Sequence, residues 1–316
     1  EPNDRSRRSS SVLVLLLALQ PPAPPSPLPQ HLAQSSLAQA GLDQRVRKPP
    51  ESLVFNSPLP QACQSLATPT AAPEAKRLLA PTGKLRVVIN SGNDVLTNTS
   101  MGKIMGISLQ ISSLLAKQLG VPIHSHLVPA AGLAYQAVAS GKATIGYFGI
   151  APQRADGSLQ AGAVDGVNYS KPYIEIFGSY EVTKTSPITS NSEVDQPGHT
   201  IVVGKNSVYN LWLDRHIRFA TIVQAPTSPL VSSYLLAHGY QIGAGIRNQL
   251  ESDAASNSNL RVLDGHFMTI KQAIATPKSL SQASPFLNQF IKSLHRSGCL
   301  SALADSNKLT GYSLPE

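Results

Sequence analysis

The sequence predicts an α/β protein made of two units of similar size, which follow a long Pro-rich leader. Short β-rich runs alternate with amphipathic helical runs over residues 84–149, and the same alternation begins again at residue 200. This pattern is typical of a sheet covered by helices. The 316-residue chain is 41% hydrophobic and 14% charged, so it is long and apolar enough to form two packed lobes.

The first 81 residues have the composition of a leader and tether. They are rich in Pro, Ser, Gln and Ala, with "PPAPPSPLP" starting at Pro21, which predicts disorder. Three arginines between positions 5 and 8 precede the apolar run 12–19, the order found in export signals. Eight residues are too few to span a bilayer. The small-x-small sequence ending at Ala40 lies well beyond that run. We therefore expect an exported, periplasmic protein.

The two cysteines predict little on their own. Cys63 lies in the predicted tether and Cys299 near the C-terminus, so neither a disulfide framework nor a paired-cysteine metal site is indicated. The "LPQA" before Cys63 is a poor match to the lipid-attachment pattern, and lipid anchoring there is not expected. Cys299 falls in an amphipathic helix, where we expect a small core residue.

The first α/β unit begins at Lys84 with the strand "KLRVVIN". A helix over residues 106–120 follows, and Gly120 is placed to end it. Then come "IHSHLV", the helical "GLAYQAVASG" and the strand "ATIGYFG". The apolar face of the first helix is made by Ile107, Ile111, Leu114, Leu115 and Leu119.

The second unit repeats this order. The strand "TIVVG" leads into a helix from about Ser207, and "TIVQA", a helix over residues 229–238 and the strand "QIGAGI" follow. A last amphipathic helix starts at Ser284 and closes near Gly298. Its apolar face comprises Phe286, Leu287, Phe290, Ile291 and Leu294.

The net charge of +8 does not indicate a nucleic-acid partner. Residues 1–80 hold eight basic and five acidic residues, so the remainder has 18 basic against 13 acidic residues, or +5. No basic stripe with interleaved aromatic residues occurs in that remainder. We therefore expect no nucleic-acid binding.

Two neighbouring stretches resemble a family signature. The sequence "SGKATIGYFGIAPQR", followed by "VNYSKPY", resembles that of family 3 extracellular solute-binding proteins, the binding components of polar amino-acid ABC importers. In that family a strand of the form "G-x-x-D-(I/V)" leads to a "T-x-x-R" loop and then to "F-S-x-P-Y". The resemblance extends in element order from Lys84 to about Leu309. It implies a two-lobed, periplasmic-binding-protein-like (type II) fold with two hinge strands and a central cleft.

The resemblance also implies domain boundaries. Lobe one would comprise residues 82–182 plus 272–316, and lobe two residues 183–271. The hinges would lie near residues 180–183 and 271–276. A small ligand can be buried on nearly all sides in a cleft between lobes, and hinge closure can trap it there.

By the same resemblance, Arg154 would bind the carboxylate of the ligand. A planar guanidinium suits this role because it can donate two parallel hydrogen bonds, although an arginine here could simply pair with a surface acid. Backbone N–H groups of the loop from Gly149 to Ala151 could contact the same anion. Ala151 replaces the threonine of the pattern, so its hydroxyl is missing. Asn248 aligns with the acid that meets the ligand's ammonium and cannot neutralise that charge.

Other candidate ligand contacts come from both units. Asn206 and Ser207 lie at the expected start of a helix, where an N-cap and an anion contact are compatible. Tyr147 and Tyr209 are candidates for the cleft walls, but tyrosines at these spacings are as often core residues. Residues 155–168 form an insertion that we interpret as a surface loop beside the cleft, or alternatively as a lid.

These features favour a non-catalytic binding protein. It would capture a small carboxylate-bearing solute and deliver it, as a monomer, to a membrane-embedded ABC importer permease. No cofactor, catalytic motif or metal site is indicated, since His124 and His126 lack a third ligand in the sequence.

The alternative is a cleft enzyme of the cyclohexadienyl dehydratase type, a class of proteins that resemble the same family. That reaction needs a general acid or base in the cleft. Glu175 and Glu181 are candidates by position but are more easily interpreted as strand or hinge residues.

Overall fold

The computed structural model describes residues 52–55, 57–100, 103–160 and 165–315, and these belong to one compact unit. The expected export signal, with its apolar run 12–19 and the small-x-small sequence, lies outside the described residues. Among the described helices, none has the length and apolar character needed to cross a membrane.

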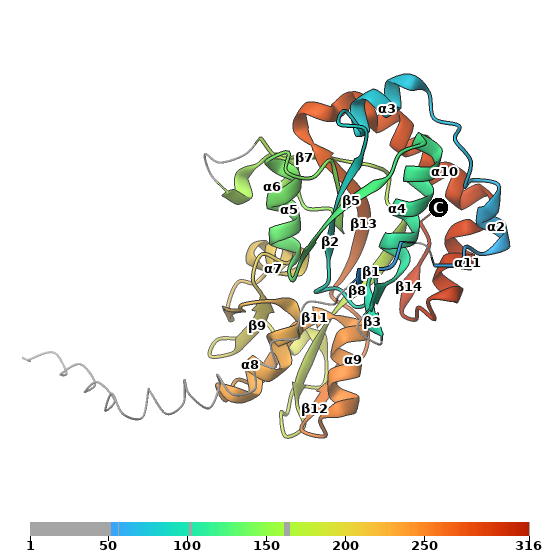
Figure 1. Ribbon diagram of the computed structural model, residues 1–316. Coiled ribbons are helices and arrows are strands. Elements are labelled where there is room, and N and C mark those ends of the chain that lie inside the picture. The colour runs from blue at the N-terminus through green and yellow to red at the C-terminus, as the bar shows by residue number, and fades with distance from the viewer. Residues whose placement is uncertain (1–51, 56, 101–102, 161–164, 316) are drawn as a thin grey trace, which may run out of the picture. The chain divides into compact units, whose positions relative to one another are not determined.

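The first half of the described chain follows the expected order of strands and helices (Figure 1). Its elements are β1 (Ser52–Leu53), α2 (Gln61–Gln64), α3 (Pro73–Leu79), β2 (Leu85–Asn90), β3 (Asn98–Ser100), β4 (Lys103–Met105), α4 (Ile107–Leu119), β5 (Ile123–Val128), α5 (Ala131–Ala139), β6 (Ile145–Gly149), α6 (Pro152–Ala155), the 3₁₀ turn η1 (Ser158–Gln160), β7 (Val167–Tyr169) and β8 (Ile174–Thr183).

The second half repeats the alternation and then returns to the first. Its elements are η2 (Asn191–Glu193), β9 (Thr200–Gly204), α7 (Val208–His216), β10 (Thr221–Ala225), η3 (Ser228–Leu230), α8 (Val231–Ala237), β11 (Ile242–Ile246), α9 (Arg247–Ser256), β12 (Leu260–Val262), β13 (Met268–Pro277), η4 (Lys278–Ala283), α10 (Ser284–Arg296), α11 (Cys299–Ser306) and β14 (Tyr312–Ser313).

One sheet connects both halves. Its strand order is β10-β9-β11-β8-β13-β6-β2-β5, and β7, β12 and β14 pair beside this path. The pairs β2–β5, β2–β6, β9–β10 and β9–β11 are parallel, whereas β8 and β13 pair antiparallel to their neighbours. A second, small sheet has the order β1-β4-β3. The parallel pairs are joined by helices, as the βαβ pattern predicted.

The two ten-residue strands β8 and β13 connect the two halves of the sheet (Figure 1). From Met268 to Gln272, β13 pairs with β8, and from Gln272 to Ala275 it pairs with β6. In β8 the partner changes at Gly178, beyond which the strand pairs with β11. Two long strands that change partners in this way match the hinge strands expected from the sequence.

Helix α4 begins and ends close to the predicted bounds. Gly120 adopts the left-handed conformation at φ 63° and closes the helix. The burial differs from the prediction of one apolar face, because every residue of α4 except Lys117 is buried. The outer side of the helix is therefore covered by another part of the chain.

That covering segment is the arm 57–81, and its prediction as disordered tether was wrong. It contains α2 and α3, and the backbone amides of Thr70 and Ala71 donate to the Gln118 carbonyl oxygen of α4. Its apolar residues Cys63, Ala75 and Leu79 belong to the main core. The Pro and Ala content therefore misled the prediction, because this segment is held in place by its packing against the rest of the core.

A disulfide between Cys63 and Cys299 joins the arm to α11. Both cysteines are fully buried. This pairing was not predicted from the sequence, in which the two positions are 236 residues apart. Because its sulfur is bonded to Cys299, Cys63 has no free thiol for lipid attachment in this structure.

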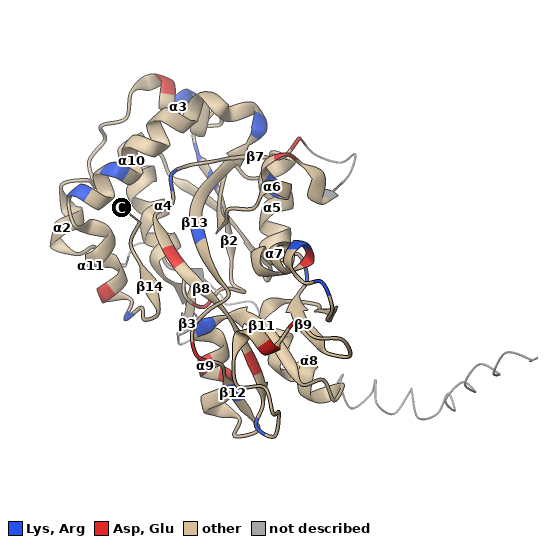
Figure 2. Ribbon diagram, turned by 180° about the vertical axis from the view of Figure 1, so that it is seen from behind, with Lys and Arg blue, Asp and Glu red and all other residues tan. Residues whose placement is uncertain are grey.

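Charged residues are scattered over the described elements (Figure 2). Both Lys or Arg and Asp or Glu occur in the upper and the lower part of the view (Figure 2).

Candidate functional site

Two small cavities lie where β2, β6 and α6 face α7, η3 and β11. The Arg154 cavity is lined by residues that include Asn90, Asn93, Phe148, Gly149, Arg154, Ser207, Val208, Ser228 and Gln272. The Asp94 cavity is lined by residues that include Asp94, Gln249 and Leu250. Gly92, Tyr209, Ser228 and Ile246 line both, so the cavities are neighbours in one cleft.

The cleft is nearly closed. The space open to the centre of a water molecule is about 20 Å³ in the Arg154 cavity and about 10 Å³ in the Asp94 cavity. Volumes of this size hold only one or two water molecules. The two sides of the cleft would have to separate for a solute of several heavy atoms to enter.

Arg154 is positioned by the short helix α6, which follows β6 after a short loop. Pro152 begins this helix, with Ala151 as its N-cap. The guanidinium is fully buried. Its Nη1 donates to the Gly149 carbonyl oxygen at 2.9 Å, and its Nη2 donates to the Asn206 carbonyl oxygen at 2.8 Å. The group also lies over the Phe148 ring, 5.3 Å from its centroid.

The Arg154 charge has no acidic partner among the described residues. Their ion pairs join Arg77 to Glu74, Arg247 to Glu251 and Lys271 to Glu175. The Nε of Arg154 is buried without a hydrogen-bond partner. Burial lowers the pKa of Arg154, and the nearby Tyr169 hydroxyl partly offsets this effect, but an arginine remains charged in proteins.

On the opposite side of the cleft, α7 begins at the cavity wall. Ser207 is its N-cap, and the Ser207 hydroxyl oxygen accepts from the Asn210 amide at 3.0 Å. Asn206 adopts a positive φ of 56° and its carbonyl oxygen meets Arg154. The cap interpretation of Ser207 is therefore confirmed, and the same residue lines the Arg154 cavity.

Four of the eight candidate contacts line one cavity, and Tyr209 is one of them. Arg154, Gly149 and Ser207 come from different elements and meet at the Arg154 cavity. Asn206 contributes its backbone carbonyl to Arg154 rather than a free side chain. Ala151 is buried and caps α6 without lining either cavity.

The loop amides between Gly149 and Ala151 are not all available to an anion. The Ile150 amide donates to the Lys271 carbonyl oxygen of β13 at 2.9 Å. The carbonyl oxygen of Gly149 faces the guanidinium. The expected cluster of free loop amides is therefore reduced, and the side chain of Arg154 is the main cation at this site.

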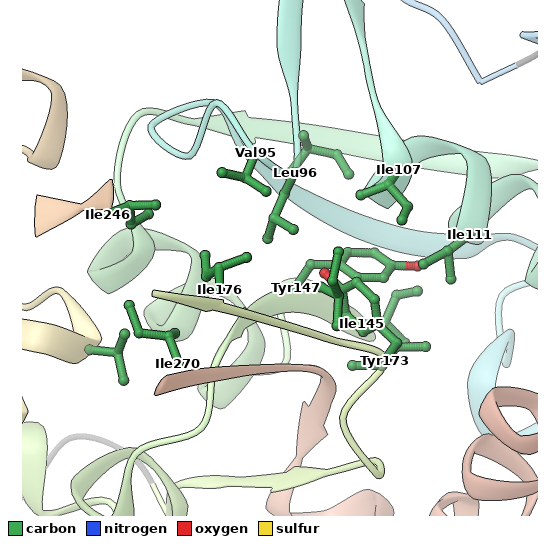
Figure 3. Close-up of a cluster of buried hydrophobic side chains, with 14 of the residues drawn as sticks. Val95, Leu96, Ile107, Ile111, Ile145, Tyr147, Tyr173, Ile176, Ile246 and Ile270 are labelled. Carbon is green, nitrogen blue, oxygen red and sulfur yellow. The ribbon is translucent and has the colours of Figure 1, made fainter. Parts of the chain in front are cut away.

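Tyr147 is a core residue and does not wall the cleft. It is 2% exposed, it accepts from the Ser112 hydroxyl at 2.9 Å, and its ring meets Tyr173 edge to face. Figure 3 shows Tyr147 among apolar side chains that include Ile111 and Ile145. Side chains alternate along a strand, so the neighbouring Phe148 faces the cleft instead.

Asn248 also points away from the cleft. Its amide nitrogen donates to the carbonyl oxygen and hydroxyl of Thr310, in the C-terminal segment. The neighbours of Asn248 that line the cavities are Gly245, Ile246, Gln249 and Leu250. The ungapped comparison with the family pattern therefore selected the wrong residue.

The sequence prediction missed several cleft residues. Asn90 ends β2 and Asn93 follows it, at the carboxyl end of a strand where ligands of open α/β sheets bind. That rule could have identified them. Their side-chain oxygens accept from the amides of Gly92 and Val95, so each can offer a solute its NH₂ group.

The two glutamates considered as general acids do not line either cavity. Glu175 accepts from the Ser313 hydroxyl and pairs with Lys271. Glu181 of β8 is fully buried, and neither carboxylate oxygen has a hydrogen-bond partner. It lies opposite Gly243, where an added Cβ would stand 2.7 Å from its Oε1. The interpretation of both as strand residues fits this geometry.

The environment of Glu181 shifts its titration. Burial raises its pKa to about 7, the nearby Ser232 hydroxyl offsets part of this effect, and the Asp253 carboxylate raises it further. Ser232 and Gln249 hydrogen-bond to Asp253, so the second carboxylate has partners of its own. Glu181 is thus a buried carboxyl group, on the α8 and α9 side of the sheet, that stays protonated to a higher pH than an exposed glutamate.

The structure describes residues 155–160 and 165–168 of the insertion. Its last residues form β7, which pairs with β13. Residues 161–164 lie outside the described residues, so the lid interpretation stays a prediction. His124 and His126 are exposed on β5, and the described residues contain no group of three potential metal ligands.

Gly149 sets how closely the two sides of the cleft approach. A Cβ there would lie 2.9 Å from Cγ1 of Val208 and 3.0 Å from Cγ2 of Ile270. We expect Gly149→Val to hold α7 away from β6 and to weaken solute binding roughly tenfold by depopulating the closed form. Gly149→Ala should give an intermediate loss. Calorimetric titration and small-angle scattering measure both effects, and unchanged affinity in Gly149→Val would contradict this reading.

Comparison with known proteins gives the fold. No family model matches the sequence, and no curated protein matches it. Solved structures do match. The solute receptor for L-cysteine of Neisseria gonorrhoeae has a TM-score of 0.62 and 20% sequence identity, over 73% of this chain and 92% of the receptor. The chain has the fold of periplasmic solute-binding proteins.

Two further structures share the solute-binding-protein fold. An amino acid ABC transporter substrate-binding protein from Streptococcus pneumoniae, bound to L-arginine, has a TM-score of 0.59 and 20% identity, over 72% of this chain and 96% of that one. An ancestral amino acid-binding protein, a precursor of cyclohexadienyl dehydratase, has a TM-score of 0.59 and 18% identity, over 73% and 98%. At these identities the likeness shows the fold alone.

Proposed function

We propose that this chain binds a small carboxylate-bearing solute in the cleft and delivers it to an ABC importer in the membrane. The fold supports this, because its solved neighbours include an amino acid ABC transporter substrate-binding protein and a receptor for L-cysteine. The protein would catalyse no reaction and would act as a monomer in the periplasm. The buried Cys63–Cys299 disulfide fits an oxidising compartment of this kind.

The observation that carries the proposal is the uncompensated charge of Arg154. A buried cation is costly unless an anion and hydrogen bonds compensate it. Here carbonyl oxygens and an aromatic ring surround the guanidinium, no described acid pairs with it, and one N–H is unpaired. A solute carboxylate in the Arg154 cavity would supply the missing anion and accept the remaining N–H groups.

Binding would be coupled to cleft closure. Three hydrogen bonds cross the cleft between α6 and the α7 region. They join Arg154 to Asn206, Gln153 to Leu211, and Arg215 to Gln153. The strands β8 and β13 connect the two sides and would act as the hinge. A solute that contacts both sides favours the closed form and shifts the open–closed equilibrium.

An enzyme of the cyclohexadienyl dehydratase type is the second candidate, because a precursor of that enzyme shares the fold. Its chemistry needs a general acid or base within reach of the substrate. Among the described residues that line the Arg154 cavity, none is an acid or a histidine. The binding function is therefore better supported, and turnover of cyclic acids would distinguish the two.

A thermal-shift screen of the full chain tests the proposal. The screen would include amino acids, hydroxy acids, oxo acids, dicarboxylates and inorganic anions, with Arg154→Met as the variant. We expect at least one carboxylate to raise the melting temperature with the logarithm of its concentration, and the shift to vanish in Arg154→Met. Arg296→Met, which removes an exposed arginine from α10, is the matched control. Equal shifts of the melting temperature in wild type and Arg154→Met would contradict the proposal.

A further inference from the structure

If the proposed function holds, the polar groups of the Arg154 cavity determine which substituent the solute can carry on the carbon next to its carboxylate. Arg154 is the only charged residue among the described residues that line this cavity. The other polar side chains carry amides or hydroxyls and belong to Asn90, Asn93, Ser207, Tyr209, Ser228 and Gln272. Asp94 lines only the neighbouring cavity, where it is exposed.

The lining of the Arg154 cavity disfavours an α-ammonium group on the solute. It is separated from its own carboxylate by a single carbon atom, so it would have to enter the Arg154 cavity together with the carboxylate. There it would lie near the guanidinium, a like charge, without a carboxylate to neutralise it. Ile246, which lines the cavity and directly precedes α9 in the chain, presents an apolar side chain. A neutral substituent avoids this cost.

Gln272 offers a partner for a neutral donor. It is 2% exposed, and its side-chain Oε1 is buried without a hydrogen-bond partner. An unpaired buried acceptor is costly, and a donor from the solute would relieve that cost. The cavity therefore combines an unpaired donor, the Nε of Arg154, with an unpaired acceptor, the Oε1 of Gln272.

The sheet places these two groups next to each other. Gln272 of β13 lies directly opposite Gly149 of β6, and the Gly149 carbonyl oxygen accepts from Arg154. Residues opposite each other in such a pair have Cα atoms roughly 5 Å apart and side chains on the same face. Gly149 has no side chain, and Val208 and Ile270 approach its Cα closely. Gln272 and Arg154 both line the Arg154 cavity, which is where a solute would meet them.

We infer that the site selects 2-hydroxycarboxylates over the matching 2-amino acids. The carboxylate would accept from Arg154, and the hydroxyl would donate to Oε1 of Gln272. The hydroxyl of Tyr209, also buried and unpaired, can donate or accept and does not discriminate between substituents. Gln272 therefore distinguishes a donating substituent from an oxo group or a hydrogen atom, whereas the absence of an acid from the described lining of the cavity disfavours the ammonium.

Matched ligands test this inference. Titration calorimetry of the full chain would compare lactate, pyruvate, propionate and alanine, and then 2-hydroxyisocaproate, 2-oxoisocaproate and leucine. We expect the hydroxy acid of each series to bind at least tenfold more tightly than the amino acid and more tightly than the oxo acid. An amino acid or oxo acid that binds as tightly as the matching hydroxy acid would overturn the inference while leaving the proposed function standing.

Variants of Gln272 test the selectivity for 2-hydroxycarboxylates separately from carboxylate binding itself. Gln272→Glu places a carboxylate at the same position and should reverse the order in favour of the amino acid. Gln272→Leu should bring the hydroxy acid and the unsubstituted acid to equal affinity. An unchanged order in both folded variants, as judged by circular dichroism, would overturn the role of Gln272. If no carboxylate binds the wild type at all, the proposed function itself fails.

Discussion

Removal of the Cys63–Cys299 disulfide is expected to lower the free energy of unfolding by about 4 kcal/mol. The bond closes a loop with a sequence separation of 236, and the constraint on the unfolded chain grows with loop length. The double variant Cys63→Ala/Cys299→Ala, unfolded in denaturant beside the oxidised wild type, measures the loss. A difference below about 1 kcal/mol would show that packing alone holds the arm.

Two controls make this result specific. Reduced wild type should be as unstable as the double variant, and the reductant should leave the double variant unchanged. Limited proteolysis should then cut first within the arm 57–81, because its contacts with α4 and α11 have lost their covalent support. Cleavage elsewhere at the same rate in all forms would argue against a separately released arm.

The second large effect is a pH-dependent stability from Glu181. Its pKa is about 7 in the folded protein against 4.5 for the unperturbed group. The folded state therefore holds a proton that the unfolded state releases between these values. The stability due to this group is full below about pH 4.5 and is lost as pH rises to about 7, a fall of about 3 kcal/mol in total.

The variant Glu181→Gln tests this prediction, because an amide cannot ionise. We expect it to remove most of the fall between pH 4.5 and 7 and to be more stable than wild type at pH 8 by roughly 2 kcal/mol. Asp253, whose pKa burial also raises, would retain a smaller slope at lower pH. Glu251→Gln, at an exposed position on α9, should keep the wild-type profile. A wild-type slope in Glu181→Gln would contradict the assignment.

Local signals predicted the regular elements well. The spacing of apolar residues predicted the positions of α4 and α10. Gly120 ends α4 in the left-handed conformation that glycine commonly adopts after a helix. Arg154 was identified through the resemblance to the solute-binding family signature, and the structure adds that it is fully buried and pairs with no acid among the described residues. These features depend on residues that are neighbours in the sequence.

Long-range features could not be predicted. The burial of the arm 57–81 depends on α4 and on Cys299, which lies 236 positions from Cys63. Whether Tyr147 or Phe148 faced the cleft depended on the register of β6 against β13. The orientation of Asn248 is set by Thr310 in the C-terminal segment. Each of these outcomes is decided by tertiary pairing, not by local propensity.

The most direct test of the central claim is one pair of calorimetric titrations, with wild type and Arg154→Met and the best carboxylate from the screen. If Arg154 is the anion-binding cation of the cleft, the variant loses at least about 100-fold in affinity, the equivalent of a charged hydrogen-bonded contact. Its ligand-free unfolding free energy should stay equal or rise, because an unpaired buried charge has been removed. A variant that binds as well as wild type, or that unfolds at much lower denaturant, would show that Arg154 is structural.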